Sequence, residues 1–255
     1  MSSIAQLKER IKAFPWGLWA SQGLGVLMLE LKRNVLGKRS LFVLLLALAP
    51  VALFALALVL PIEKQIVDGV GGPNILYAVF FRTFFLRLAV FFGCVGIFTW
   101  LFRGDVLERT LHYYLLCPVP REVVVVGKYV SGVVLNFTIF GIRIVTTYFL
   151  WFLASGWATI EGFVLNGPGA GHLAAYLGVT LLACIGYGSV FLLVGLGFRN
   201  PIIPAVMILG WEWLNFLLPP FLKQFSVIYY LESLCPVPIT ESPIKILAEP
   251  ASIWL

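Results

Sequence analysis

Charged side chains are scarce in this sequence: 12% of its 255 residues are Asp, Glu, Lys or Arg, whereas 60% are hydrophobic. Soluble domains carry roughly 25% charged residues. Because a water-facing surface needs polar cover, this composition excludes a soluble globular protein and predicts that lipid surrounds much of the chain. The apolar runs leave no room for a separate soluble domain, so we expect one membrane domain.

Histidine and paired cysteines are also scarce. The chain has only two histidines, His112 and His172, and its four cysteines form no Cys-x-x-Cys pair. This excludes a His-rich metal site and argues against a zinc site or a disulfide framework. No metal or cofactor is therefore expected on this chain.

A phosphate-binding loop is missing as well. The loop needs Gly-x-x-x-x-Gly-Lys-Ser/Thr to surround phosphates with backbone N–H groups. The two Gly-Lys pairs, at 37–38 and 127–128, have Lys32 and Glu122 where the first glycine is required. The chain is therefore not expected to hydrolyse ATP itself, nor to be an enzyme.

What the chain does have is long apolar runs. A helix that crosses the bilayer needs about 20 mostly apolar residues, and five runs meet this length: 40–61, 75–102, 129–154, 173–197 and 201–218. The apolar stretch that follows is too short to cross again, which favours a re-entrant segment at about 219–235. We therefore predict an all-α integral membrane protein with five or six transmembrane helices in residues 40–255.

The N-terminal part, 1–39, is expected on the cytoplasmic side. Within it, 18–39 has helical spacing, with Leu24, Leu27, Met28, Leu31 and Val35 on one side and Glu30, Arg33, Asn34 and Gly37 on the other. This pattern predicts an amphipathic helix lying in the headgroup layer with its polar side toward water. A short cytosolic helix packed on another surface is the alternative.

Basic residues set the predicted orientation. With the N-terminus inside, twelve Lys and Arg fall on the cytoplasmic side, whereas Lys64, Lys223 and Lys245 fall outside. The excess of basic residues inside predicts a multi-pass protein of the bacterial inner membrane with a cytoplasmic N-terminus. The formal charge of +6 is explained by this distribution, so nucleic acid is not expected as a partner.

The cytoplasmic segment between the second and third predicted spans is the second most charged part of the chain. Asp105 and Glu108 approximate a capping box, and Pro118 ends the pattern. We predict a short amphipathic helix at about 104–117. The residues alone leave an ordinary polar loop as an equal alternative.

This segment resembles the ABC type-2 permeases, the membrane subunits of many bacterial exporters. The match consists of an aromatic residue, two acids, Thr-Leu, further apolar residues, Pro-Val-x-Arg and Gly-Lys: Phe102, Asp105, Glu108, Thr110, Leu111, Leu115, Leu116, Pro118, Val119, Arg121, Gly127 and Lys128. The helix at 18–39 and the broken segment after the fifth span also look like that family, whereas the family's usual sixth span is absent.

The resemblance implies that the cytoplasmic helix is a coupling helix, which contacts a separate ATPase subunit that holds ATP and Mg. The residues implied in coupling are Asp105, Glu108, Arg109, Thr110, His112, Tyr113, Tyr114, Pro118 and Arg121. It further implies a dimer with a second permease copy, and outward movement of a hydrophobic or amphipathic substrate. The alternatives are a haem-export-type permease of cytochrome c maturation and a structural subunit of a larger membrane complex. A lipid-metabolising membrane enzyme is disfavoured, because this sequence lacks the Asp or His cluster that such enzymes usually carry.

Four charges fall within predicted spans: Arg82, Arg87, Arg143 and Glu212. Charges in hydrocarbon are costly and usually face the protein interior, water or an opposite charge. They are candidates either for an outer cavity that attracts an anionic or zwitterionic amphiphile, or for ion pairs of the arginines with Glu212 or Glu161. The arginines could also extend to outer headgroups.

Overall fold

The computed structural model describes residues 16–35, 45, 48–56, 72–107, 109, 116, 119–198, 200–214 and 219–237. Every regular element in these residues is helical, and none of them forms a strand. Three helices, Pro73–Leu101, Arg121–Ala154 and Gly169–Gly197, are long and apolar enough to cross a membrane. The expectation of an all-helical architecture with helices long and apolar enough to span a membrane is therefore confirmed for the described residues.

The first of these helices is built from three successive elements. α5 (Pro73–Phe80) begins directly after Gly72, whose φ of 100° suits a glycine, and proline fits the first helical position. It continues as the π-helix η1 (Phe81–Val90) and then as α6 (Phe91–Leu107). A helix long and apolar enough to cross a membrane therefore covers the predicted span 75–102, and it extends beyond both predicted ends.

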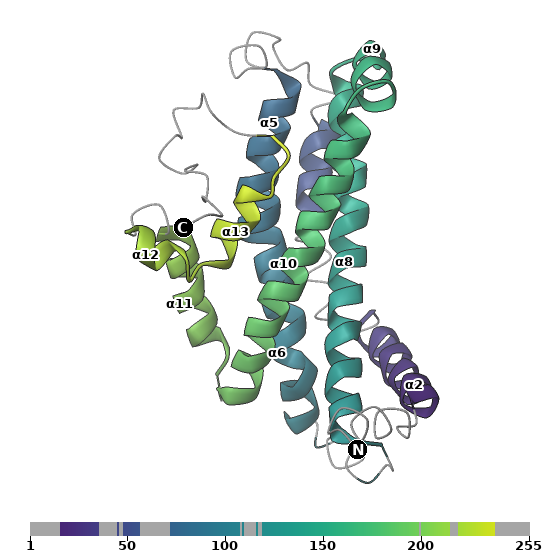
Figure 1. Cartoon of the computed structure of the whole chain (residues 1–255), viewed down its shortest axis with the longest axis vertical. Coiled ribbons are helices and arrows are strands. Elements are labelled where there is room, and N and C mark those ends of the chain that lie inside the picture. Colours follow the sequence, from purple (N-terminus) through teal and green to yellow (C-terminus); the bar gives the residue numbers. More distant parts are fainter. Residues whose placement is uncertain are drawn as a thin grey trace, which may run out of the picture.

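The other two long helices run beside the first (Figure 1). α8 (Arg121–Ala154) begins directly after Pro120, eight residues before the predicted start of the span, and α10 (Gly169–Gly197) begins four residues early. At 1.5 Å per residue, the 34 residues of α8 extend about 51 Å, more than the roughly 30 Å of hydrocarbon. An upright α8 centred in a bilayer would therefore extend beyond the hydrocarbon at both ends.

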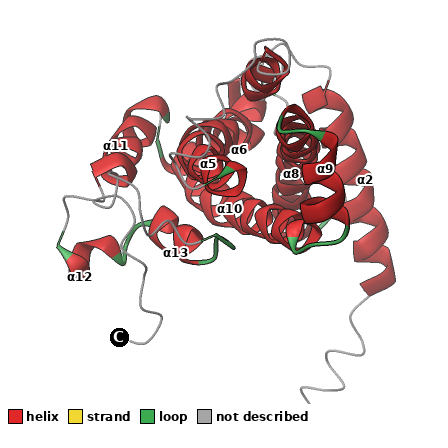
Figure 2. Ribbon diagram, turned by 90° about the horizontal axis from the view of Figure 1, so that it is seen from above, coloured by secondary structure: helices red, strands yellow, loops and turns green. Residues whose placement is uncertain are grey.

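Glycines bring α10 close to α6. A Cβ on Gly195 would lie 2.7 Å from the Thr99 carbonyl oxygen, and one on Gly188 would lie 2.6 Å from the Phe98 ring. Small residues permit such close helix contacts in lipid. Figure 2 shows α10 lying beside both α6 and α8, so the close packing of α10 unites the three long helices.

The N-terminal helix, α2 (Trp16–Val35), crosses the first turns of α8 (Figure 1). Its Glu30 is only 2% exposed, whereas Met28 is 70% exposed and Leu24 57%. The prediction that the polar side of this helix faces water is therefore wrong for Glu30. The physical reason is an ion pair with Lys128 of α8, which draws the carboxylate inward and leaves leucine and methionine on the outer surface.

The fifth predicted span contains α11 (Ile202–Trp213), a helix of 12 residues that is apolar but shorter than a full crossing. The segment that follows contains α12 (Pro220–Lys223) and α13 (Val227–Ser233), which lie on one side of the long helices in Figure 1. Two short helices in place of one long one agree with the broken apolar segment expected there.

Two further predictions concern less regular parts. Of the first predicted span, 40–61, the structure describes 45 and 48–56 as helix, and the remainder lies outside the described residues. The connection between the predicted spans 129–154 and 173–197 contains the short helices α9 (Trp157–Thr159) and η2 (Ile160–Leu165). Phe54 packs against Tyr77 and Trp151, with ring centroids 6.1 Å and 5.4 Å apart, so residues 48–56 lie against α5 and α8.

Candidate functional site in two clusters of buried charge

A buried lysine joins three helices at one end of the bundle. Lys128, in the third turn of α8, has no exposed surface, and its Nζ donates to Asp105 Oδ2 at 2.6 Å. The same Nζ donates to a carboxylate oxygen of Glu30 on α2 and, at 3.3 Å, to the Leu101 carbonyl of α6. We call Glu30, Asp105 and Lys128 the base cluster.

The positions of these residues follow from helix direction. Asp105 lies in the last turn of α6, and Lys128 lies near the start of α8, the next long helix of the chain. Antiparallel neighbours bring the end of one helix to the start of the other, while α2 passes beside α8 and adds Glu30 (Figure 1). Because removing one partner leaves a buried charge uncompensated, such a cluster fixes the relative positions of its helices strongly.

Asp105 was expected to cap a separate cytoplasmic helix, and that expectation is wrong. α6 continues to Leu107, so Asp105 lies within the preceding helix, and its side chain is fully buried. Lys128 provides the physical reason, because its ammonium compensates the carboxylate in the interior. Asp105 therefore lies beneath the surface on which a coupling partner was expected.

Few of the other expected coupling residues are described. Glu108, Thr110, His112, Tyr113, Tyr114 and Pro118 lie outside the described residues. Arg109 is exposed and has a φ of 56°, an uncommon backbone conformation for a residue with a side chain, and Arg121 is exposed at the start of α8. The two described arginines thus lie at the surface, Arg109 just beyond the end of α6 and Arg121 at the first position of α8.

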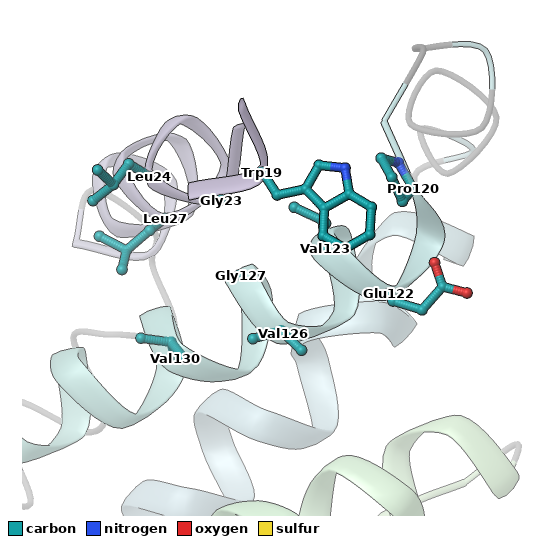
Figure 3. A pocket seen from close by; sticks show the side chains of 10 residues that line it. All are labelled: Trp19, Gly23, Leu24, Leu27, Pro120, Glu122, Val123, Val126, Gly127 and Val130. Carbon is teal, nitrogen blue, oxygen red and sulfur yellow. The ribbon is translucent and has the colours of Figure 1, made fainter. Parts of the chain in front are cut away.

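An apolar groove of about 770 Å³ adjoins the base cluster, between α2 and the first turns of α8 (Figure 3). Its lining is Trp19, Gly23, Leu24, Leu27, Pro120, Glu122, Val123, Val126, Gly127 and Val130. A Cβ on Gly127 would lie 3.2 Å from Val26 and 3.3 Å from the Gly23 carbonyl, so α2 and α8 touch closely at this level. Glycine at 127 thereby lets the two helices approach next to Lys128.

A second group of charges joins the long helices to the segment after α11. Arg87 of η1 donates to Glu232 Oε1 of α13 from both Nη2, at 2.7 Å, and Nε, at 3.1 Å. The side chains are 8% and 15% exposed. Arg87 therefore has a different partner from Glu212 or Glu161, which were the expected candidates.

Glu212 of α11 accepts hydrogen bonds at the start of α13. Its carboxylate receives the Ser226 hydroxyl at 2.7 Å, the Val227 N–H at 3.0 Å and the Ile228 N–H at 3.2 Å. The first N–H groups of a helix have no partner within the helix, so a buried carboxylate there satisfies them. We call Arg87, Glu212, Glu232 and Ser226 the C-terminal clamp.

The remaining two arginines in the spans differ from Arg87. Arg82 donates from Nη2 to the Val237 carbonyl oxygen at 2.7 Å, which adds a further connection between η1 and the chain after α13. Arg143 of α8 is partly buried, and its Nε is buried without a hydrogen-bond partner. In the part of the chain that the structure describes, no carboxylate pairs with Arg143.

Sequence reasoning did not single out four members of these clusters, which are Glu30, Lys128, Ser226 and Glu232. Glu232 was not considered because it lies in a short apolar run outside the predicted spans. Lys128 was assigned to the cytoplasmic end of a span, where a lysine normally reaches water. The Gly-Lys pair of the motif was the available signal, since a motif lysine at a helix base calls for an acidic partner. Among the described residues, no group of three or more His, Cys, Asp or Glu is placed to hold a metal ion.

Comparison of the chain with known protein families, with curated proteins and with solved structures found no match.

Proposed function

We propose that this chain is the transmembrane permease subunit of an ABC transporter, which moves a hydrophobic or amphipathic molecule outward. ATP and Mg are held by a separate ATPase subunit, and a second permease copy completes the pathway. The chain then lies in the inner membrane with a cytoplasmic N-terminus and five or six spans, including a re-entrant segment after the fifth. The resemblance at 102–128 is the sequence basis of this proposal.

One observation carries the proposal furthest. Both Asp105 and Lys128 belong to the motif, and they form a buried ion pair of 2.6 Å at the junction of α6 and α8. The segment between the two helices is short, and this fully buried ion pair joins its two ends. A coupling segment needs such a connection in order to transmit the conformational change of an ATPase subunit to the two spans.

The base cluster also explains why α2 belongs to the same mechanism. Glu30 bonds the same lysine, so any displacement of the α6–α8 junction acts on α2 as well. α2 carries exposed Leu24, Met28 and Leu29 on its outer side. A helix with an apolar outer side and a buried carboxylate fits a position at the cytoplasmic membrane boundary, where it would move with the spans.

The proposal is tested by purifying the tagged full chain from its native membranes in mild detergent. We expect an ATPase subunit with a phosphate-binding loop to co-purify in stoichiometric amount and to hydrolyse ATP. Glu108→Arg should remove that subunit, whereas Glu161→Arg, the same charge reversal at an exposed position between α8 and α10, should retain it. Loss of the subunit from both variants, or from neither, would contradict the proposal.

The orientation has its own test, which uses a chain without native cysteines. Lys32→Cys is exposed on α2, and Glu161→Cys is exposed at the opposite end of α8. A membrane-impermeant maleimide should label the first only from the cytoplasmic side and the second only from outside. Position 30 is unsuitable as a reporter because the native side chain there is buried. Labelling of both cysteines from one side would overturn the predicted topology.

A further inference from the structure

Three arginines lie in the predicted spans, and the structure accounts for two of them. Arg87 is paired with Glu232, and Arg82 donates to the Val237 carbonyl oxygen. The buried Nε of Arg82 has no hydrogen-bond partner, but its guanidinium is bonded through Nη2. Arg143 differs from both, because among the described residues no carboxylate pairs with its guanidinium and no hydrogen bond holds it. An arginine stays charged in proteins, so this guanidinium needs a compensating group.

The depth of Arg143 makes that need acute. It lies 22 residues after Arg121 and 11 before Ala154, the ends of α8. At 1.5 Å per residue it is about 8 Å from the middle of α8, within a hydrocarbon core that extends roughly 15 Å to each side of a centred helix. A charged residue at that depth is a functional-site candidate whose partner has to be identified.

The neighbouring polar groups on α8 are already used. The Thr147 hydroxyl donates to the Arg143 carbonyl oxygen at 2.9 Å, and the Thr146 hydroxyl donates to the Ile142 carbonyl oxygen at 2.8 Å. Both hydroxyls donate to the backbone of their own helix, and neither carries a negative charge that could compensate the guanidinium. The compensating group has to come from elsewhere.

The surroundings indicate where that group comes from. On α8, Arg143 stands between a buried side that contains Phe140 and Ile144 and an outer side where Ile142 is 54% and Phe149 42% exposed. A side chain at this edge is accessible from the surrounding lipid as well as from the bundle. A guanidinium presents a planar set of donors that matches phosphate or carboxylate oxygens in bidentate geometry.

We propose that Arg143 binds the anionic headgroup of an amphiphile in the half of the membrane near Ala154. That this amphiphile is the transported substrate rests on the proposed transport function. The substrate would then carry an anionic group, phosphate or carboxylate, attached to an apolar body. Arg87 is excluded from that role because Glu232 occupies its guanidinium.

The test measures lipid binding by the full chain without an ATPase. The detergent-purified protein is given equal amounts of phosphatidylglycerol and phosphatidylcholine with identical acyl chains, and retained lipids are identified by native mass spectrometry. The wild type should prefer phosphatidylglycerol, and Arg143→Gln should reduce that preference roughly tenfold, as expected for a lost charge-assisted hydrogen bond. Arg143→Lys should be intermediate, because an ammonium lacks the bidentate geometry.

Arg87→Gln is the matched control, since it removes an arginine that already has a partner. It should lower the melting temperature and leave the lipid preference unchanged. Arg143→Gln should instead reduce the lipid preference and leave the melting temperature nearly unchanged. Retention of the full preference by Arg143→Gln, or a loss of thermal stability equal to that of Arg87→Gln, would overturn the proposal. Displacement of the lipid by excess glycerol 3-phosphate would also overturn it, because the site would then bind a soluble anion.

The readout is independent of ATP hydrolysis, so its failure is distinguishable from failure of the proposed function. A chain that co-purifies with an ATPase and lacks the lipid preference remains a permease with a different substrate contact. A chain with the preference and no ATPase partner has the binding site without the transport function.

Discussion

The base cluster and the C-terminal clamp place charge inside the same bundle in different ways. The base cluster sets one lysine against two carboxylates, with Lys128 and Asp105 fully buried and Glu30 2% exposed. The ion pair of the clamp sets one arginine, Arg87, against one carboxylate, Glu232, and these side chains are 8% and 15% exposed. The first fastens α2, α6 and α8 to one another, whereas the second fastens a short terminal helix to the long ones.

The difference shows how burial determines the consequence of losing a charge. A pair that is closed to water leaves its surviving member without hydration, and the cost is then large. A pair at a partly open position can be relieved by water or headgroups, so its loss costs less. We therefore expect the base cluster to determine whether the bundle assembles, and the clamp to determine where α13 lies.

The largest effect is expected for Lys128→Met. It leaves Glu30 and Asp105 buried without the ammonium and should reduce the free energy of unfolding by about 3–5 kcal/mol. Thermal unfolding of the detergent-purified chain measures this loss, with Lys32→Met at an exposed position of α2 as the control. The triple variant Glu30→Gln, Asp105→Asn, Lys128→Met should recover part of the stability, and an unchanged single variant would remove the distinction between the two clusters.

A smaller effect is expected for the clamp. Arg87→Gln and Glu232→Gln should each cost about 1.5–3 kcal/mol, the range for hydrogen bonds to charged groups. A double-mutant cycle on the two positions should show coupling, whereas Arg87 with Glu212 should be additive because Glu212 bonds to Ser226 and the start of α13. Coupling of Arg87 to Glu212 instead of Glu232 would show that the clamp is wrongly assigned.

The smallest effect is expected for Ser226→Ala. It removes one hydrogen bond to the buried Glu212 carboxylate and leaves those of the Val227 and Ile228 N–H groups, so the loss should be about 1.5 kcal/mol, the lower end of the range for bonds to charged groups. Thermal unfolding measures it, with Ser233→Ala as the control for a hydroxyl that bonds only the backbone of its own helix. A loss as large as that of Arg87→Gln would contradict this ranking, because the hydroxyl would then contribute as much to the free energy of unfolding as the ion pair.

Much of the helical architecture could be predicted from the sequence, because lipid requires long apolar runs. The spans at 75–102, 129–154 and 173–197 were found this way, although their helices extend further because protruding ends need no hydrophobicity. α11 shows the limit of the approach. The apolar run predicted a span over 201–218, but the helix has only 12 residues, because apolar composition does not determine where a helix ends.

The ion pairs could not be predicted, because they depend on tertiary position. Glu30 appeared as part of a polar helix side, yet Lys128, 98 residues away, draws it inward. Arg87 had two plausible acidic partners in the sequence, and a third acid, Glu232, lies 145 residues away and receives its hydrogen bonds. Helical spacing shows which side chains share a face, whereas the neighbour opposite that face follows only from the packing of distant segments.

The measurement that tests the central claim most directly is ATP hydrolysis by the reconstituted complex in liposomes, with and without a variant coupling segment. Glu108→Arg, or Tyr113→Asp together with Tyr114→Asp, should leave the chain inserted and folded but abolish its stimulation of the ATPase. Glu161→Arg should leave stimulation at the wild-type level. Undiminished stimulation by the coupling-segment variants would contradict the assignment of this chain as the permease subunit driven through residues 104–117.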